Sequence, residues 1–211
     1  MNLPVIVVGG GGHAKVLIEA LLTMGSDVLG YTDPDESVKT VSGLSRLGDD
    51  QAILKYDPEK LRLVNGVGST ASTSLRRSIY DRFRMKGYRF RIVAHSSAVI
   101  ASDVLLEDGV QIMAGAVVQP GCRLGTDAII NTGASIDHDC DIGPHVHIAP
   151  GAVLSGNVRI EEGVHVGVGA IIIQGVVIGE ESVIGAGSVV LQNVPPCATV
   201  VGVPGRVIRR N

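Results

Sequence analysis

One histidine in the second half of the chain stands among carboxylates. His138 lies between Asp137 and Asp139, and Asp141 follows two residues later. An imidazole, whose ordinary pKa is about 6.5, can take a proton from an attacking amine near neutral pH, and a carboxylate on its other ring nitrogen fixes the tautomer and raises the basicity. The residues therefore point to general-base chemistry by His138, with Asp139 as the orienting carboxylate and Asp137 as the alternative.

Two other interpretations of this stretch remain open. It can be a solvent-facing turn that contains a histidine, because Asp is common in turns. It can also be a metal site, since one His and three Asp cluster here. Alternate residues of an extended segment point to opposite sides, however, so we expect no metal to be held by these residues alone.

The chain that carries this histidine is rich in small and aliphatic residues. It has 211 residues, of which 28 are Gly, 45% are hydrophobic and only 3% are aromatic. The net charge is −3 and there is no basic run, which argues against a nucleic-acid partner. The N-terminal apolar run is too short to span a membrane, and the three cysteines do not form a disulfide framework. We therefore expect a cytoplasmic protein with no membrane insertion.

The second half of the chain repeats with a period of six. Every sixth position from 100 to 190 is aliphatic, and the residue four places after each of the first fifteen is Val, Ala, Cys or Ser. This hexapeptide repeat predicts a parallel β-helix, in which the aliphatic residues point inward and the small ones fill a tight interior. The sixteen aliphatic positions are Ile100, Leu106, Ile112, Val118, Leu124, Ile130, Ile136, Ile142, Ile148, Leu154, Ile160, Val166, Ile172, Ile178, Ile184 and Val190.

The first half alternates strands and helices. Apolar runs at 4–8, 28–32, 61–69 and 88–93 favour strands, and the stretches 16–24 and 72–87 favour helices. This order predicts a small, Rossmann-like parallel α/β sheet over about residues 1–93. The glycine-rich loop at 9–12 follows the first strand and opens the first helix, so its N–H groups can face a phosphate.

An NAD site is one interpretation of this loop. Asp33 ends the second strand about 20 residues further on, where a carboxylate can bind a ribose hydroxyl, and Gly68 ends the third strand at the same edge. The loop meets the dinucleotide pattern only as G-x-G-x-x-A, however, and the segment is short for both halves of a dinucleotide fold. The competing interpretation is a site for the nucleotide part of a nucleotide-linked ligand.

The hexad, together with the segments GGGGHAK and DHDC, resembles the hexapeptide-repeat sugar acetyltransferases over nearly the whole chain. The resemblance is to the branch that contains the nucleotide-sugar N-acetyltransferases and the sialic acid O-acetyltransferases. It implies a left-handed β-helix in which three hexads form one coil, so that residues 18 apart stack and residues 100–189 make five coils. It also implies a homotrimer that binds acetyl-CoA between neighbouring β-helices, with active sites between subunits.

The resemblance suggests roles for individual residues. His138 and Asp139 match the His-acid pair of the family, and Gly156, one coil further on, would offer its backbone N–H to the oxyanion of the tetrahedral intermediate. The residues expected to bind acetyl-CoA are His147, Val168, Ala186, Val203 and Pro204. The residues expected to bind the nucleotide-linked sugar are Gly11, Gly12, His13, Asp33, Pro34, Gly68 and Asn131.

The prediction is thus an acetyl-CoA-dependent N-acetyltransferase for a nucleotide-linked 4-amino-deoxysugar, with GDP-perosamine favoured and no metal required. We expect an α/β nucleotide-sugar domain at 1–94, a β-helix domain at 95–195 and a C-terminal segment near the CoA site at 196–211. The alternatives are O-acetylation of a sugar such as sialic acid and N-acetylation of a UDP-linked amino sugar. A metal-dependent β-helical hydrolase and a non-catalytic scaffold are more remote alternatives.

Overall fold

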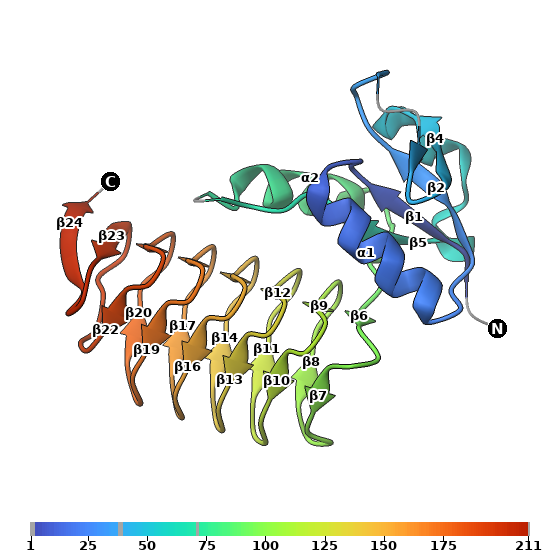
Figure 1. Ribbon diagram of the computed structural model, residues 1–211. Helices are drawn as coiled ribbons and strands as arrows, with labels where there is room; N and C mark the ends of the chain where they lie inside the picture. The colour runs from blue at the N-terminus through green and yellow to red at the C-terminus, as the bar shows by residue number, and fades with distance from the viewer. Residues whose placement is uncertain (1–2, 38–39, 71, 211) are drawn as a thin grey trace.

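The computed structural model describes residues 3–37, 40–70 and 72–210. Figure 1 shows an N-terminal α/β part, coloured blue to teal, and a stack of coils that continues to the C-terminus. Within the described ranges, no helix is both long and apolar enough to cross a membrane.

The α/β part is a five-stranded sheet with an apolar core on each face. The strand order is β3-β4-β2-β1-β5, and the central strand β1 runs parallel to both β2 and β5. Val5 and Val7 pack in the cluster that contains helix α1, whereas Ile6 and Val8 pack in the cluster that contains helix α2, because successive side chains of a strand point to opposite faces. The elements are β1 (Val5–Val8), α1 (Gly12–Thr23), β2 (Val28–Thr32), β3 (Thr40–Val41), β4 (Leu44–Gly48), β5 (Arg62–Asn65), α2 (Ser74–Met85) and the 3₁₀ turns η1 (Asp50–Lys55) and η2 (Pro58–Lys60).

The structure adds a short antiparallel pair that the apolar pattern did not predict. Strands β3 and β4 form a hairpin around Ser42 and Gly43, which both have positive φ angles. Strand β3 has two residues, of which only Val41 is buried, so it leaves no alternation of apolar and polar residues to detect. The strand expected at 88–93 is reduced to an isolated bridge at Phe90 and to β6 (Val93–Ala94), which belongs to the β-helix.

The predicted repeat forms the strands of the β-helix. Each of the strands from β7 to β22 has two residues, and the second residue is the predicted aliphatic one. Each strand from β7 to β19 pairs in parallel with the strand three places later, as in Val117 with Ser135, so the predicted stack of residues 18 apart is confirmed. The strands are β7 (Val99–Ile100), β8 (Leu105–Leu106), β9 (Gln111–Ile112), β10 (Val117–Val118), β11 (Arg123–Leu124), β12 (Ile129–Ile130), β13 (Ser135–Ile136), β14 (Asp141–Ile142), β15 (His147–Ile148), β16 (Val153–Leu154), β17 (Arg159–Ile160), β18 (His165–Val166), β19 (Ile171–Ile172), β20 (Val177–Ile178), β21 (Val183–Ile184) and β22 (Val189–Val190).

The strands form three sheets, which are the faces of the β-helix. The eight-stranded sheet has the order β24-β23-β21-β18-β15-β12-β9-β6, the six-stranded sheet runs from β22 to β7, and the third sheet runs from β20 to β8. At the C-terminal end, β23 (Ala198–Val201) pairs antiparallel with β24 (Arg206–Arg210). The aliphatic residues and the small residues four places later fill one continuous core, which includes Cys122 and Cys140.

Turns join the three sheets at three corners, each named here by the sheet that precedes it. The first corner follows the eight-stranded sheet, as at residues 131–134, the second follows the six-stranded sheet, as at 137–140, and the third follows the remaining sheet, as at 143–146. In the second corner one turn position has a positive φ in four successive coils, at Gly121 (75°), Asp139 (61°), Asn157 (56°) and Gly175 (72°). Asp and Asn are the side chains that adopt this left-handed conformation most readily.

Candidate active site

His138 and Asp139 form a directly bonded pair in the second corner. His138 Nδ1 lies 2.8 Å from Asp139 Oδ2, while Asp137 Oδ1 accepts the backbone N–H of His138 at 2.8 Å. Both members of the pair are exposed, with 61% and 66% of their side-chain surfaces accessible. A carboxylate accepts a hydrogen bond, so Nδ1 carries the proton of the neutral ring and Nε2 presents a lone pair. The structure therefore places Asp139 on the ring and Asp137 on the backbone.

The environment of His138 favours its role as a proton acceptor. The hydrogen bond to Asp139, and then the negative charge of Asp137, raise the pKa of His138 above its ordinary value. No cluster of three or more His, Cys, Asp or Glu within the described ranges is arranged to hold a metal ion.

Gly156 lies against the imidazole, one coil further on. A Cβ added at this position would lie 2.6 Å from both Cε1 and Nε2 of His138, and the three atoms nearest to it all belong to that ring. The Gly156 N–H donates to no acceptor within the described part of the chain. An unoccupied amide beside a basic ring nitrogen is a suitable donor for a developing oxyanion.

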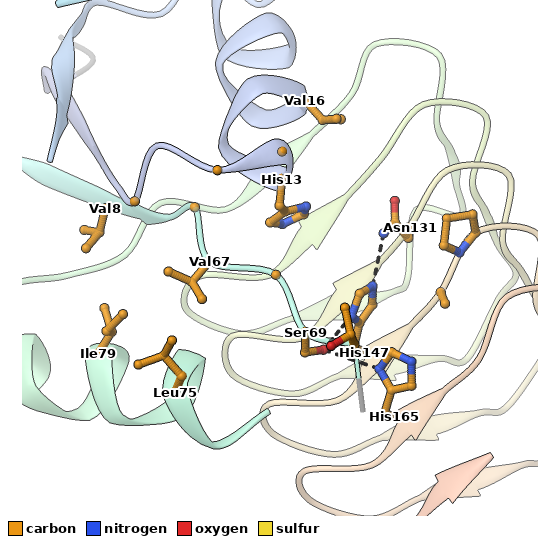
Figure 2. A pocket seen from close by; sticks show the side chains of 18 of the residues that line it. Val8, His13, Val16, Val67, Ser69, Leu75, Ile79, Asn131, His147 and His165 are labelled. Atoms are coloured by element: carbon orange, nitrogen blue, oxygen red, sulfur yellow. Dashed lines mark hydrogen bonds between the residues drawn. The ribbon is translucent and has the colours of Figure 1, made fainter. Parts of the chain in front are cut away.

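A large cavity separates the α/β part from the eight-stranded sheet of the β-helix. Its volume is about 1220 Å³, and residues of both parts line it (Figure 2). The predicted residues that line it are Gly11, Gly12, His13, Asp33, Pro34, Gly68, Asn131, His147, Val168 and Ala186. The remaining predicted residues, which are His138, Asp139, Gly156, Val203 and Pro204, do not line it.

The glycine loop forms one wall of the cavity, at the N-terminus of α1. Cβ atoms at Gly11 and Gly12 would meet nothing within 4 Å, so these two positions leave open space beside the first amides of the helix. The helix has no side-chain cap, which leaves its N–H groups free for an anion. Asp33 already supports this loop, because its two carboxylate oxygens accept the N–H of Gly10 at 2.7 Å and of Asp35 at 2.8 Å.

His147 is held by hydrogen bonds at both ring nitrogens. Asn131 Oδ1 accepts the N–H of Thr132 at 2.8 Å, so the Asn131 amide donates to His147 Nε2 at 3.0 Å. His147 Nδ1 must then carry the proton and donate to Ser69 Oγ at 2.7 Å. Dashed lines mark both hydrogen bonds in Figure 2. Burial lowers the pKa of His147 to about 3, so the ring is neutral near pH 7.

His13 is fixed in a similar way on the opposite side of the cavity. Gln111 Nε2 donates to Asn65 O at 2.8 Å, so Gln111 Oε1 accepts the Nε2–H of His13 at 2.7 Å. Burial lowers the pKa of His13 to about 4. The neutral ring therefore presents Nδ1 as an acceptor. His165, whose ring centroid lies 5.0 Å from that of His147, completes this group of imidazoles.

The first corner provides free backbone donors at the end of the cavity near β18 and β21. The N–H groups of Val168 and Ala186 have no acceptor within the described part of the chain. Val203 and Pro204 lie between β23 and β24, both of them exposed.

Ser69 and His165, which line the cavity, and Gln111, which holds His13 from behind, were not among the predicted site residues. Ser69 and Gln111 contact residues of the opposite part of the chain only because the α/β part packs on the β-helix. The outward direction of Gln111 and His165 was available from the repeat, since both precede an inward aliphatic residue of a strand.

Both halves of the chain match known families. Residues 4–83 match the PglD N-terminal domain, and residues 103–138 and 157–192 match the bacterial transferase hexapeptide (six repeats). Among curated proteins, no sequence matches the chain.

Solved structures match the chain over almost its whole length. The perosamine N-acetyltransferase PerB of Caulobacter crescentus, in complex with CoA and GDP-perosamine, is 38% identical with a TM-score of 0.90, over 97% of this chain and 96% of that one. The acetyltransferase domain of PglB from Neisseria gonorrhoeae, also solved with acetyl coenzyme A, is 33% identical with a TM-score of 0.91, over 98% of this chain and 100% of that one. WeeI from Acinetobacter baumannii, at 23% identity and a TM-score of 0.80, shares the fold over 97% of this chain and 99% of that one.

These matches confirm the expected architecture, an α/β part followed by a left-handed β-helix. They do so across both parts of the chain and at identities above 30%. The chain therefore belongs to the hexapeptide-repeat family of CoA-dependent sugar N-acetyltransferases.

Proposed function

We propose that this protein transfers the acetyl group of acetyl-CoA to the 4-amino group of a nucleotide-linked deoxysugar, with GDP-perosamine as the favoured substrate. The observation that carries the proposal is the His138–Asp139 pair, whose ring packs against Gly156, a residue whose N–H donates to no acceptor within the described part of the chain. The choice of sugar and nucleotide is supported by the 38% identity to PerB, which was solved with GDP-perosamine.

In the proposed reaction, His138 Nε2 accepts a proton from the sugar amine while the amine nitrogen attacks the thioester carbonyl carbon. The new C–N bond forms, and the Gly156 N–H donates to the oxygen that becomes negative. When the tetrahedral intermediate collapses, the C–S bond breaks and His138 returns the proton to the leaving sulfur. The products are the N-acetylated sugar and CoA, and no covalent enzyme intermediate is needed.

The two parts of the chain would divide the binding of the substrates. The α/β domain, proposed at 1–94, would hold the nucleotide diphosphate at the N-terminus of α1, where Gly11 and Gly12 leave open space. The free N–H groups of Val168 and Ala186 in the β-helix domain, proposed at 95–195, would bind the pantetheine arm. The C-terminal segment, proposed at 196–211, would contact the adenine through Val203 and Pro204, which are exposed.

His138 lies outside the cavity of its own chain, so we propose that a second copy completes the active site. The six-stranded sheet, which leads into the corner of His138, presents an apolar outer face with exposed Val99, Val153 and Ile171. A face of this kind is suited to packing against another copy. In a homotrimer with three such contacts, His138 of one copy would reach the cavity of its neighbour.

A thiol-release assay with acetyl-CoA tests the proposal. GDP-perosamine should be acetylated, and UDP- and dTDP-linked 4-amino sugars should be poorer substrates. Release of CoA with free sialic acid would support O-acetylation instead. If no 4-amino sugar linked to GDP, UDP or dTDP were turned over, the proposed function would be wrong.

The same assay on a His138→Asn variant tests the catalytic role of the histidine. General-base catalysis typically contributes about 10²–10⁴-fold, so kcat/KM should fall by at least about 100-fold. A loss below about tenfold would remove His138 from the mechanism.

A further inference from the structure

Helix α2 buries an arginine at a position where its pattern calls for an apolar residue. Arg76 precedes Ile79, Tyr80 and Phe83 on the buried face of the helix, and its side chain is only 1% exposed. An isolated buried guanidinium would be strongly destabilising, so its partners must account for its presence.

All five N–H groups of Arg76 have acceptors. Nη2 donates to Asp127 Oδ1 at 2.6 Å and to Asp127 O at 3.1 Å, and Nε donates to the same carbonyl at 3.2 Å. Nη1 donates to the carbonyl of Asn65, the last residue of β5, at 2.9 Å, and to that of Val67 at 2.8 Å, in the loop at 66–69 that lines the cavity. One side chain of the α/β part therefore holds both the third corner of the β-helix and the loop that follows β5.

Asp127 is the matching group on the β-helix. It is fully buried in the third corner with a φ of 57°, and its second oxygen, Oδ2, lies 3.1 Å from His145 Nδ1. Asn65 Nδ2 lies 3.4 Å from each carboxylate oxygen and 3.0 Å from Arg76 O. The carboxylate of Asp127 is thus surrounded by Arg76 and Asn65 of the α/β part and by His145 of the β-helix.

The two carbonyls that Arg76 holds lie on either side of Gly66. This position has no room for a side chain, because an added Cβ would lie 2.7 Å from Val7 Cγ1 and 2.8 Å from Val8 O. Gly66, Val67, Gly68 and Ser69 all line the cavity, and Ser69 Oγ reaches His147 at 2.7 Å. Gln111 of the β-helix also donates to Asn65 O, so the contact that Arg76 alone provides to this cavity wall is the one at Val67 O.

We propose that Arg76 is a positioning residue for nucleotide-sugar binding, which it serves by fixing the loop at 66–69 against the β-helix. Arg76 itself does not line the cavity. With the loop fixed in advance, the substrate does not have to order this wall of the cavity when it binds. The inference relies on the proposed function only for the identity of the ligand.

The neighbouring residue provides a matched control. Arg77 also connects α2 to the β-helix, through Glu162 at 2.6 Å and Glu181 at 3.5 Å, but its side chain is 43% exposed and contacts no residue of the cavity loop. If the connection between the two parts were all that mattered, loss of Arg77 would affect nucleotide binding as loss of Arg76 does.

The experiment compares Arg76→Met, the double variant Arg76→Met/Asp127→Asn, and Arg77→Met as full-length chains. Arg76→Met leaves Asp127 buried without its cation, so its Tm should fall. The double variant removes both charges together and should recover most of that Tm. Asn65 O keeps the hydrogen bond from Gln111 Nε2 in both variants, but neither variant supplies a donor to Val67 O, so both should bind the ligand more weakly.

Three quantities are measured on each variant: the Kd of GDP by titration calorimetry, the KM of the nucleotide sugar and the KM of acetyl-CoA. In the double variant we expect the Kd of GDP and the KM of the sugar to rise about tenfold, with the KM of acetyl-CoA changed less than about twofold. Arg77→Met should leave all three unchanged.

A double variant that recovers its Tm and binds GDP like the unaltered protein would reduce Arg76 to a structural role and overturn the inference. Equal weakening by Arg77→Met would overturn it as well. If the unaltered protein bound neither GDP, UDP nor dTDP, the proposed function and this inference would both fail. Weaker binding of GDP and of the nucleotide sugar in the Arg76 variants alone would support the inference.

Discussion

Replacement of Gly156 by Ala should lower the activity about 100-fold without destabilising the protein. The new methyl carbon would lie 2.6 Å from Cε1 and Nε2 of His138, whereas non-bonded carbon atoms prefer about 3.5–4.0 Å, so the ring must move by roughly 1 Å. Because 61% of the His138 side chain is exposed, the ring can turn away freely, and in doing so it loses its bond to Asp139. The backbone N–H of residue 156 is retained, so the substitution acts on the histidine alone.

The expected loss follows from the size of this displacement. A misplacement of about 1 Å in a catalytic group costs about 100-fold in rate, or ~2.7 kcal/mol of transition-state stabilisation. Gly156 has no positive φ, so Ala is compatible with its backbone and should leave the Tm unchanged or slightly raised. Steady-state kcat/KM from the thiol-release assay and Tm by calorimetry measure the two effects.

A double variant, Gly156→Ala/His138→Asn, supplies the control. If the alanine acts through the ring, it should add little to the loss already caused by His138→Asn. Gly156→Ala with activity within about threefold of the unaltered protein would refute the proposed position of the base. A full additional loss in the double variant would show that residue 156 acts by another route.

Three further predictions concern the pair, the buried histidines and the outer face. Asp139→Asn removes the largest cause of the raised pKa of His138, so the limb of the kcat/KM profile that reports this base should move to lower pH and the plateau should fall about 10–100-fold, both read from a pH series. His13 and His147 have pKa values lowered from 6.5 to about 4 and about 3, so the unfolded chain takes up protons first and the free energy of unfolding should fall as the pH drops from 6.5 towards 4. Calorimetric scans over this range should show a smaller decline in His147→Gln, and an unchanged slope would contradict the assigned neutral state. Ile171→Asp places a charge on the apolar outer face of the six-stranded sheet, so analytical ultracentrifugation should show that the oligomer dissociates, and the thiol-release assay should show that activity is lost. A monomeric variant that kept its activity would exclude an active site shared between copies.

The β-helix was predictable from the sequence because its rule is local. An inward aliphatic residue every six positions fixes which side chains are buried and which residues lie one coil apart. The contact between His138 and Gly156 follows from this register alone, as does the outward direction of the histidine.

The parts that escaped prediction depend on how the α/β part packs on the β-helix. Arg76 and Asp127 are 51 residues apart, and no pattern in either segment indicates that they meet. The Asn131–His147–Ser69 chain of hydrogen bonds likewise joins residues from both parts. The sequence also did not indicate that His138 lies outside the cavity, because neither the periodicity nor the spacing shows which corner of the β-helix the α/β part approaches.

The left-handed position in the second corner allows a catalytic pair to be placed in a regular β-helix. Gly121, Asp139, Asn157 and Gly175 occupy the same place in four successive coils. An Asp at this place satisfies the backbone and at the same time holds the imidazole of the residue before it, so the pair interrupts neither the hexad nor the interior. The His138–Asp139 pair therefore depends on the turn and not on the rest of the coil, and the same two side chains could be placed on another coil with the backbone path unchanged.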